Sequence, residues 1–478
     1  MKNKCKKRRR EVSEFIYEYI YSPTLTAHTE CKFPSEILCE YSSPGLFFGL
    51  PPDDQEEYYI GMTQDNGGHA VVFGGSGSGK STGIVNPSMK TWNGGMFVFD
   101  LKGEHVPFYD NLWRNKVVDR PYILLDLRDN SEYSLDLFWW VKNDVETNVV
   151  DNIKEIVYAI VPEGGSKDKF WEESERSIFT AALLYYYWHG YSFIKAITAI
   201  ANTTIFELCA DLSTCDDNDV KKHLRNISHI KHETLALIGT SLTNHISVIF
   251  SSHVINKALS GSENGGKCFN WSDLEKYNIF LSVSEDKIEQ WGGIINLIHS
   301  QLIHYLMRRQ EKYTVEGANT VPILLLLDEV AQLGRVKILP QAIATLRSKN
   351  VSICLLVQSL AQLDKIYGEI DRRVILDNCS FKVILHASDP QTQQFLCDLI
   401  GKAKSLSSSM SKNYDSNINI IGYSAHISEN RDYLIYPEEL AYLNDVILLT
   451  PFGRYRIRKF QNYNIFHKLY FSSQFTCF

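Results

Sequence analysis

A run of eight residues, 74–81, combines glycines with a lysine and a hydroxyl (GGSGSGKS). It fits the pattern GxxxxGK[ST], in which glycines let main-chain N–H groups approach an anion and the following helix presents its positive end to it. In this pattern the lysine reaches the β- and γ-phosphates and the last hydroxyl ligates magnesium. The pattern predicts a site for ATP and Mg²⁺ with Ser81 as a metal ligand, formed by Gly74, Gly75, Ser76, Gly77, Ser78, Gly79, Lys80, Ser81 and Thr82.

Two acidic residues, Asp328 and Glu329, directly follow an apolar run at residues 323–327. In open parallel sheets the reacting groups collect at the carboxyl ends of the strands. We expect Asp328 to hold magnesium, usually through water, and Glu329 to polarise the attacking water as general base. Gln358 ends the next apolar run; from the residue alone it either senses the γ-phosphate or orients water, or is an ordinary glutamine at the end of a strand. Lys80, Asp328, Glu329 and Gln358 together predict hydrolysis rather than nucleotide binding alone.

The strands that must position these residues alternate with helical patterns. Short apolar runs predict strands at residues 70–73, 95–101, 122–127, 277–283, 322–327, 351–357, 378–386, 445–450 and 453–461. Such alternation indicates an α/β fold with a mostly parallel sheet. We place strand 95–101, and with it Lys102 and Glu104, beside the strand that leads into residues 74–81. A short helix is expected at residues 11–21, then turn-rich sequence to residue 65, while serine-rich residues 405–417 are expected to form a mobile loop.

Between residues 144 and 265 the pattern is helical and contains no convincing strand. This texture predicts an all-α domain inserted into the α/β fold. The expected organisation is an N-terminal segment at 1–65, a nucleotide-binding domain split between 66–143 and 266–465, the insertion at 144–265, and a C-terminal tail at 466–478.

Composition narrows the class of protein. The chain has 478 residues and a net charge of −7, so any contact with nucleic acid has to be local, in a channel or a patch. Its ten cysteines form no CxxC pair, which argues against a zinc site or a disulfide scaffold and suits a reducing cytosol. The longest apolar region, 178–201, is interrupted by His189, Gly190 and Lys195, so we expect no transmembrane segment.

Several motifs, in one order along the chain, resemble those of the type IV secretion coupling proteins, the TraG/TraD-like conjugative ATPases. Residues 328–335 (DEVAQLGR) resemble the family's DEF-x-x-LGR stretch, with Val330 where phenylalanine is usual. Residues 358–368 resemble its QS-x-x-QL…YG motif, and residues 377–379 (DNC) and 387–392 (ASDPQT) resemble later motifs. Residues 100–104 (DLKGE) resemble DPKGE, and residues 170–171 (FW) resemble the opening of the family's helical domain.

This resemblance implies a RecA-type P-loop motor domain and an all-α domain, assembled as a homo-hexamer that can form on DNA. It implies that the ring moves single-stranded DNA, often with an attached relaxase, to the components of a type IV secretion channel. The family usually has N-terminal transmembrane helices, and no such segment is recognisable in this chain. We therefore expect a cytoplasmic protein, peripheral at the inner face of the cell membrane, which is either held there by a membrane-anchored partner or is a truncated form of a longer protein.

The resemblance also assigns an arginine. Arg347, in residues 345–350 (TLRSKN), matches the family's arginine-bearing helix end and would act as the arginine finger on a nucleotide bound by the neighbouring subunit. Arg335 is a second candidate. From the sequence alone, Arg347 could equally be a cation at the C-terminus of a helix, where the helix dipole stabilises positive charge. Arg454, Arg456 and Arg458 share one strand face, which either lines a pore or is simply solvated.

Two other functions remain open. One is a substrate-docking receptor that binds ATP for assembly and recruits cargo without translocation. The other is an FtsK- or HerA-like pump on double-stranded DNA, which the order of motifs after Gln358 disfavours. A small-molecule kinase is disfavoured because adjacent Asp328 and Glu329 suit hydrolysis and no lid-like arginine cluster is evident.

Overall fold

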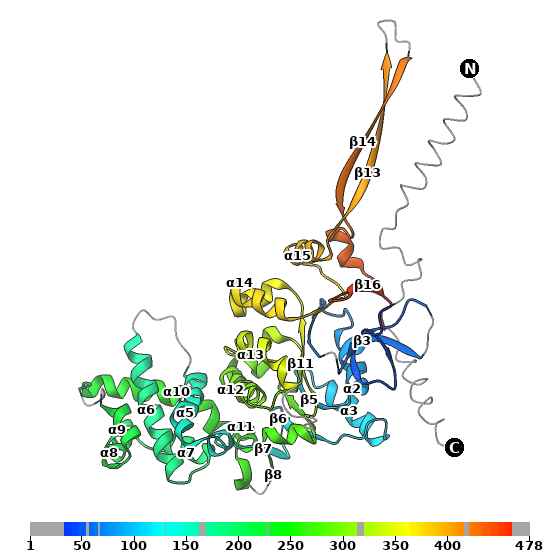
Figure 1. Cartoon of the computed structure of the whole chain (residues 1–478). Coiled ribbons are helices and arrows are strands. Elements are labelled where there is room, and N and C mark those ends of the chain that lie inside the picture. Colours follow the sequence, from blue (N-terminus) through cyan, green and yellow to red (C-terminus); the bar gives the residue numbers. More distant parts are fainter. Residues whose placement is uncertain are drawn as a thin grey trace, which may run out of the picture.

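The computed structural model describes residues 33–460, apart from 54–56, 66, 130, 162–168, 226, 228, 265, 313–319 and 415–419; for 405–427 it describes the backbone only. At its centre lies a nine-stranded sheet with the order β16-β15-β12-β4-β11-β10-β5-β9-β6 (Figure 1). The strands from β12 to β6 are parallel to one another, and β15 and β16 extend the sheet in antiparallel fashion. The strands are β4 (His69–Phe73), β5 (Gly95–Asp100), β6 (Tyr122–Asp126), β9 (Asn278–Ser282), β10 (Ile323–Leu327), β11 (Val351–Val357), β12 (Phe381–Ile384), β15 (Val446–Thr450) and β16 (Gly453–Ile457).

The sheet is covered on both faces because its strands are apolar on both faces. Along β10, Leu325 and Leu327 enter one core while Leu324 and Leu326 enter the other. Successive residues of a strand point to opposite faces, and strands buried on both sides read as continuous apolar runs. One face packs against α12 (Ile288–Met307), α13 (Leu339–Leu346) and α14 (Leu360–Asn378), and the other packs against α2 (Asn86–Thr91) and α3 (His105–Arg114).

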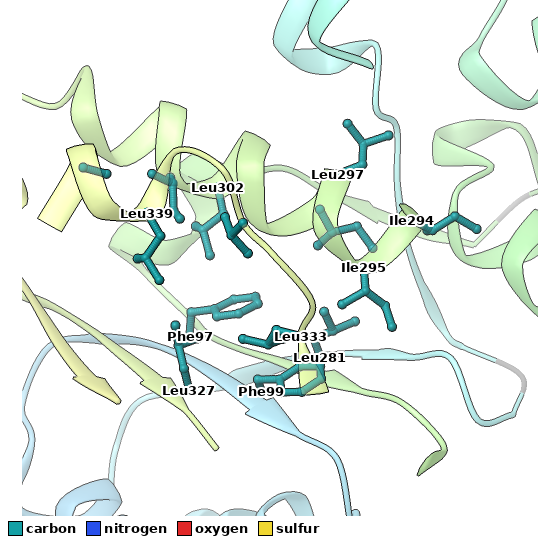
Figure 2. Packing of buried hydrophobic residues seen from close by; sticks show 14 of the residues in the cluster. Phe97, Phe99, Leu281, Ile294, Ile295, Leu297, Leu302, Leu327, Leu333 and Leu339 are labelled. Carbon is teal, nitrogen blue, oxygen red and sulfur yellow. The ribbon is translucent and has the colours of Figure 1, made fainter. Parts of the chain in front are cut away.

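Figure 2 shows the first of these faces, with strand residues meeting helix residues. Phe97, Phe99 and Leu327 face Ile295 and Leu302 of α12, and every one of them is at most 2% exposed. The carboxyl ends of the strands are thus held by a packed core, so side chains placed there have a rigid support.

The expected all-α insertion is confirmed as part of the fold. It contains α5 (Val149–Ile160), α6 (Lys169–Trp188), α7 (Phe193–Asn202), α8 (Ile205–Thr214), α9 (Asn218–Leu224), α10 (His232–Ser251) and α11 (His253–Ala258), and it lies to one side of the sheet (Figure 1). Its apolar residues join the core on the α12 face. Asp144, at its start, accepts hydrogen bonds from Asn152 at 2.7 Å and from Arg308, just after α12, at 2.5 Å, which ties the insertion to the α/β part.

One expectation about the chain between residues 33 and 65 is corrected. Instead of turns alone, it contains the strands β1 (Leu38–Glu40), β2 (Gly45–Gly49) and β3 (Tyr58–Thr63), which form an antiparallel sheet of order β1-β3-β2. Leu46 and Ile60 pack into the α2–α3 side core. The strands are short and separated by glycine and proline, so the sequence pattern concealed them. The helix expected at residues 11–21 lies outside the described residues.

The described part of the serine-rich segment, residues 405–414, is not a loop but belongs to a strand, and residues 415–417 lie outside the described residues. β13 (Lys402–Tyr414) and β14 (Ile420–Tyr433) pair as a long antiparallel hairpin, which projects away from the rest of the described molecule (Figure 1). A strand is usually recognised by a buried apolar face that repeats every second residue. These two strands project away from the core of the described residues, which is the physical reason why their sequence lacked that signal.

Among the described helices, only α10 is long and apolar enough, by length and composition, to cross a membrane. The region that the sequence singled out as most apolar, 178–201, is instead divided between α6 and α7.

Candidate active site

The predicted site residues, with the exception of Arg347, meet at the carboxyl edge of the sheet. β4 leads into the glycine-rich loop, β11 into Gln358, and β10 into Asp328 and Glu329. The strand that contains residues 95–100, β5, was expected beside β4, but the strand order is β4-β11-β10-β5, so this expectation is wrong. β10, which carries the two acidic residues, is not the immediate neighbour of β4 either. β11 lies between them, and this inserts Gln358 between the phosphate loop and the acids.

The glycine-rich loop wraps closely around the side chain of its own lysine. Nζ of Lys80 donates to the carbonyl oxygens of Gly74 and Gly75 at 2.6 and 3.2 Å. Gly77 and Gly79 have φ angles of +72° and +90°, which favour glycine, and a Cβ at Gly74 would collide with Oγ of Ser78. The chain then continues as a π-helical turn (Ser81–Val85) into α2, so helical N–H groups face the loop.

Lys80 is buried beside two carboxylates. Burial lowers its pKa, and the charges of Glu329 and Asp328 oppose this effect without cancelling it. Its Nζ lies 3.7 Å from Oε1 of Glu329. A phosphate group can replace the two carbonyl oxygens as the hydrogen-bond partner of this ammonium, and such charge-assisted hydrogen bonds are strong.

Glu329 is held from two sides. Oε2 of Glu329 accepts a 2.7 Å hydrogen bond from Nε2 of Gln358, while its other oxygen faces Lys80. Its backbone has φ 53° and ψ 54°, a left-handed conformation that is strained for a residue other than glycine. Since such strain collects at functional sites, the conformation supports the choice of Glu329 as a reacting group.

Asp328 has one engaged oxygen and one open oxygen. Oδ2 lies 3.2 Å from Nε2 of His105, whereas Oδ1 is buried and has no hydrogen-bond partner among the described residues. An orphaned carboxylate oxygen next to a phosphate site fits magnesium, a hard cation that takes oxygen ligands. Asp328 and the hydroxyl of Ser81 are the residues that would hold it.

His105 belongs to the site although the sequence did not single it out. It begins α3, and its Nδ1 lies 3.2 Å from Oδ1 of Asn86 in α2. Burial lowers its pKa, but the hydrogen bond with Asp328 and the charges of Asp100, Asp328 and Glu104 outweigh burial and raise it. The sequence signal that could have pointed to His105 is its position directly after the DLKGE stretch. Lys102 and Glu104 of that stretch were expected near the site, and the charge of Lys102 does lower the pKa of Lys80.

Two further residues lie against the glycine-rich loop from the β12–β16 side. A Cβ at Gly75 would lie 2.9 Å from Nδ1 of His386, and a Cβ at Gly79 would lie 3.3 Å from Cε of Lys459. Burial lowers the pKa of Lys459. Both residues fall within expected strands, but nothing in the sequence indicated that the sheet order would bring them to the loop.

Arg347 is not in this site. It is an exposed residue just before β11, and it lines a surface pocket of about 310 Å³ together with Gly67, Lys312, Ala344, Ser348, Asn350, Val351 and Ser352. Its charge acts on His69, the first residue of β4, so it lies at the amino edge of the sheet.

Three other arginines that the sequence singled out have partners within the chain. Arg335 pairs with Asp371 at 2.8 Å, Arg456 pairs with Asp445 at 2.9 Å, and Arg454 donates to the carbonyl of Ile400. These contacts of Arg454 and Arg456 favour a solvated face of β16 over a face that lines a pore.

Comparison with known proteins finds sequence relatives among VirD4 and TraG proteins. VirD4 of Rhizobium radiobacter is 24% identical over 427 residues, covering 84% of this chain and 58% of VirD4, and TraG of the same organism is 23% identical over 349 residues, covering 70% and 52%. The chain therefore spans between half and three fifths of the length of these relatives.

Solved structures of plasmid coupling protein TrwB share the fold. Its unbound form has a TM-score of 0.58 at 16% identity, with 90% of each chain covered, and its complex with ADP and Mg²⁺ has a TM-score of 0.57 at 17% identity, with 84% of this chain and 88% of TrwB covered. A family model described as type IV secretory system conjugative DNA transfer matches residues 46–459, and this span holds both the sheet edge and the helical insertion. The chain belongs to that family.

Proposed function

We propose that this chain is an ATPase that uses hydrolysis to move DNA toward a type IV secretion channel. The main observation that supports ATP hydrolysis is that four residues lie together at one edge of the sheet: Lys80, Glu329, Gln358 and Asp328. A phosphate-binding loop alone would support nucleotide binding only. A glutamate held 3.7 Å from the loop's lysine adds a group that can take a proton from water.

Each residue then has a role in hydrolysis. The main-chain N–H groups of the loop and Lys80 bind the phosphates, and Lys80 leaves the carbonyls of Gly74 and Gly75 to do so. Mg²⁺, when bound with ATP, neutralises charge on the β- and γ-phosphates. Asp328 and Ser81 would hold that ion, Glu329 accepts the proton of the attacking water, and Gln358 keeps Glu329 in place.

The link to DNA rests on relatedness. The family is described by conjugative DNA transfer, and TrwB, with a similar fold, has been solved with an ATP analogue and with ADP and Mg²⁺. For this chain we propose single-stranded DNA with its relaxase as cargo, a homo-hexameric ring, and a location at the inner face of the membrane. We further propose the all-α insertion at 144–265 as a separate domain of this motor.

Arg347 is proposed as a finger that acts on a neighbouring copy. The support is its place at the amino edge of the sheet, exposed and away from the site of its own chain. A mixing experiment tests this role: copies with Lys80→Ala supply Arg347, and copies with Arg347→Ala supply an intact loop. Mixtures should hydrolyse ATP faster than either variant alone; mixtures no faster than the better variant would remove the finger.

The function itself is tested by ATPase assays with single-stranded DNA, double-stranded DNA or no DNA. Lys80→Ala should lower turnover by at least about 100-fold, and Glu329→Gln should bind ATP and turn over slowly. We expect stimulation by single-stranded DNA. Stimulation by double-stranded DNA only would indicate a pump of the FtsK or HerA type, and ATP binding with no DNA effect and no translocation would indicate a docking receptor.

A further inference from the structure

A buried histidine lies behind the carboxylate that is expected to hold magnesium. His105 is 2% exposed, and its two ring nitrogens lie 3.2 Å from Oδ2 of Asp328 and 3.2 Å from Oδ1 of Asn86. A carboxylate only accepts hydrogen bonds, so Nε2 carries the hydrogen and donates it to Asp328. The ring therefore bridges α2, which follows the phosphate loop, and the end of β10.

The main chain fixes the place of this ring. The carboxylate of Asp100, at the end of β5, accepts hydrogen bonds from the N–H groups of Glu104, His105 and Val106, each at 3.1 Å. Gly103, with φ +69°, makes the tight turn before them. The first turn of α3 is thereby anchored to the sheet, and His105 cannot move away from Asp328 without breaking this anchor.

The consequence for Asp328 is an asymmetry between its oxygens. Oδ2 is occupied by His105, while Oδ1 is buried with no partner among the residues that the structure describes. A buried carboxylate oxygen without a partner is unfavourable, and a bound cation would remove this cost. Carboxylates that ligate metals are commonly held in this way by a hydrogen bond to their second oxygen.

We infer that His105 is a positioning residue for Asp328: it holds Oδ2 and so presents Oδ1 to the hydrated magnesium of the bound nucleotide. The inference rests on the proposed function, because it assumes that Asp328 serves magnesium. It assigns His105 no contact with the nucleotide and no proton transfer. Its effect is on the affinity for the metal, since partners of this kind are worth about 10- to 100-fold in metal affinity.

The test compares His105→Ala with His105→Gln in the full chain. The readout is the binding of a fluorescent ADP analogue titrated at increasing Mg²⁺, which needs no turnover. His105→Ala should raise the Mg²⁺ concentration for half-maximal effect by about 10- to 100-fold, while affinity in EDTA stays the same. His105→Gln can still donate to Asp328 and should recover most of the loss.

The matched control is His299, another buried histidine. Its Nδ1 lies 2.7 Å from the carbonyl oxygen of Ile295, and its ring packs against Phe97 and Phe99, away from Asp328. His299→Gln should lower the melting temperature without changing the Mg²⁺ requirement.

The outcomes separate this inference from the proposed function. If the parent chain binds no nucleotide, or binds it independently of Mg²⁺, the proposed function fails. If the parent chain needs Mg²⁺ and His105→Ala needs the same concentration, the positioning role is wrong. If His105→Ala does not fold, Asn86→Ala replaces it, because this variant removes the Oδ1 atom that faces Nδ1 of His105. A raised Mg²⁺ requirement in Asn86→Ala supports the positioning role, and an unchanged requirement overturns it.

Discussion

Replacing Gln358 by alanine should slow hydrolysis without weakening nucleotide binding. Gln358 does not belong to the phosphate loop; its Nε2 donates to Oε2 of Glu329 at 2.7 Å. Among the described residues, the other oxygen of this glutamate faces Lys80 alone, at 3.7 Å. In the variant, the general base loses the one short hydrogen bond that the structure gives its carboxylate, and the carboxylate can turn away from the position of the attacking water.

The size of the effect follows from the nature of this bond. Glu329 is buried, and a hydrogen bond to a charged group contributes about 1.5–3 kcal/mol. A factor of ten in rate corresponds to about 1.4 kcal/mol of activation free energy. If the bond is needed in the transition state, kcat should fall by about 10- to 150-fold. KM for ATP should stay within about threefold, because the loop and Lys80 are untouched.

Steady-state kinetics at saturating Mg²⁺ measures both parameters. Gln394→Ala is the matched control, since Gln394 is an exposed glutamine that hydrogen-bonds Tyr433 and Asp398 on the surface. It should match the parent chain in both parameters. If Gln358→Ala keeps the parent kcat, or changes KM alone, the hydrogen bond from Gln358 does not support the general base.

Three further changes test the surroundings of the site. Lys459→Ala should raise KM for ATP by several-fold in a steady-state assay while kcat is retained, because Cε of Lys459 lies against Gly79 and its charge attracts the phosphates; an unchanged KM contradicts this. Gly292→Ala, in α12 with open space around its Cβ, should stabilise the protein by about 0.5–1 kcal/mol in chemical denaturation, and destabilisation would contradict the packing described. Burial raises the pKa of Asp144, but its hydrogen bonds with Arg308, Asn152, Val145 and Asn148 outweigh burial and hold it well below its usual range. Its stabilisation is therefore present above about pH 4 and lost as the pH falls further, so Asp144→Asn should melt at a lower temperature at pH 7 and show a smaller loss on acidification than the parent chain.

Much of this fold could be predicted from the sequence because the sheet is covered on both faces. Strands such as β10 and β11 are buried throughout, so they read as apolar runs with sharp ends. The residues at those ends, Asp328 and Gln358, could be placed at one edge because parallel strands share a direction. The glycine-rich loop was recognisable because each of its residues has a chemical reason to be there.

The remaining features depend on contacts between distant parts of the chain. The insertion of β11 between β4 and β10 is a property of strand order, which apolar runs do not encode. His105, His386 and Lys459 reach the site from α3, the end of β12 and the end of β16, and each is an ordinary residue in its local sequence. The hairpin of β13 and β14 went unrecognised because it projects away from the core of the described residues, so that core imposes no apolar alternation on it.

The geometry of β11 explains why Arg347 cannot serve the nucleotide of its own chain. The strand has seven buried residues, with Arg347 shortly before its first residue and Gln358 directly after its last. At about 3.3 Å per residue it spans roughly 23 Å, several times what a single side chain bridges. The strand is packed on both faces, so it cannot shorten to bring the two ends together. If Arg347 acts on a nucleotide at all, a second copy must bring its amino edge to the carboxyl edge of the first, and a complete site then exists only between copies. Recovery of activity in the mixture of Lys80→Ala and Arg347→Ala copies is therefore a measurement of that shared site and not of either fold alone.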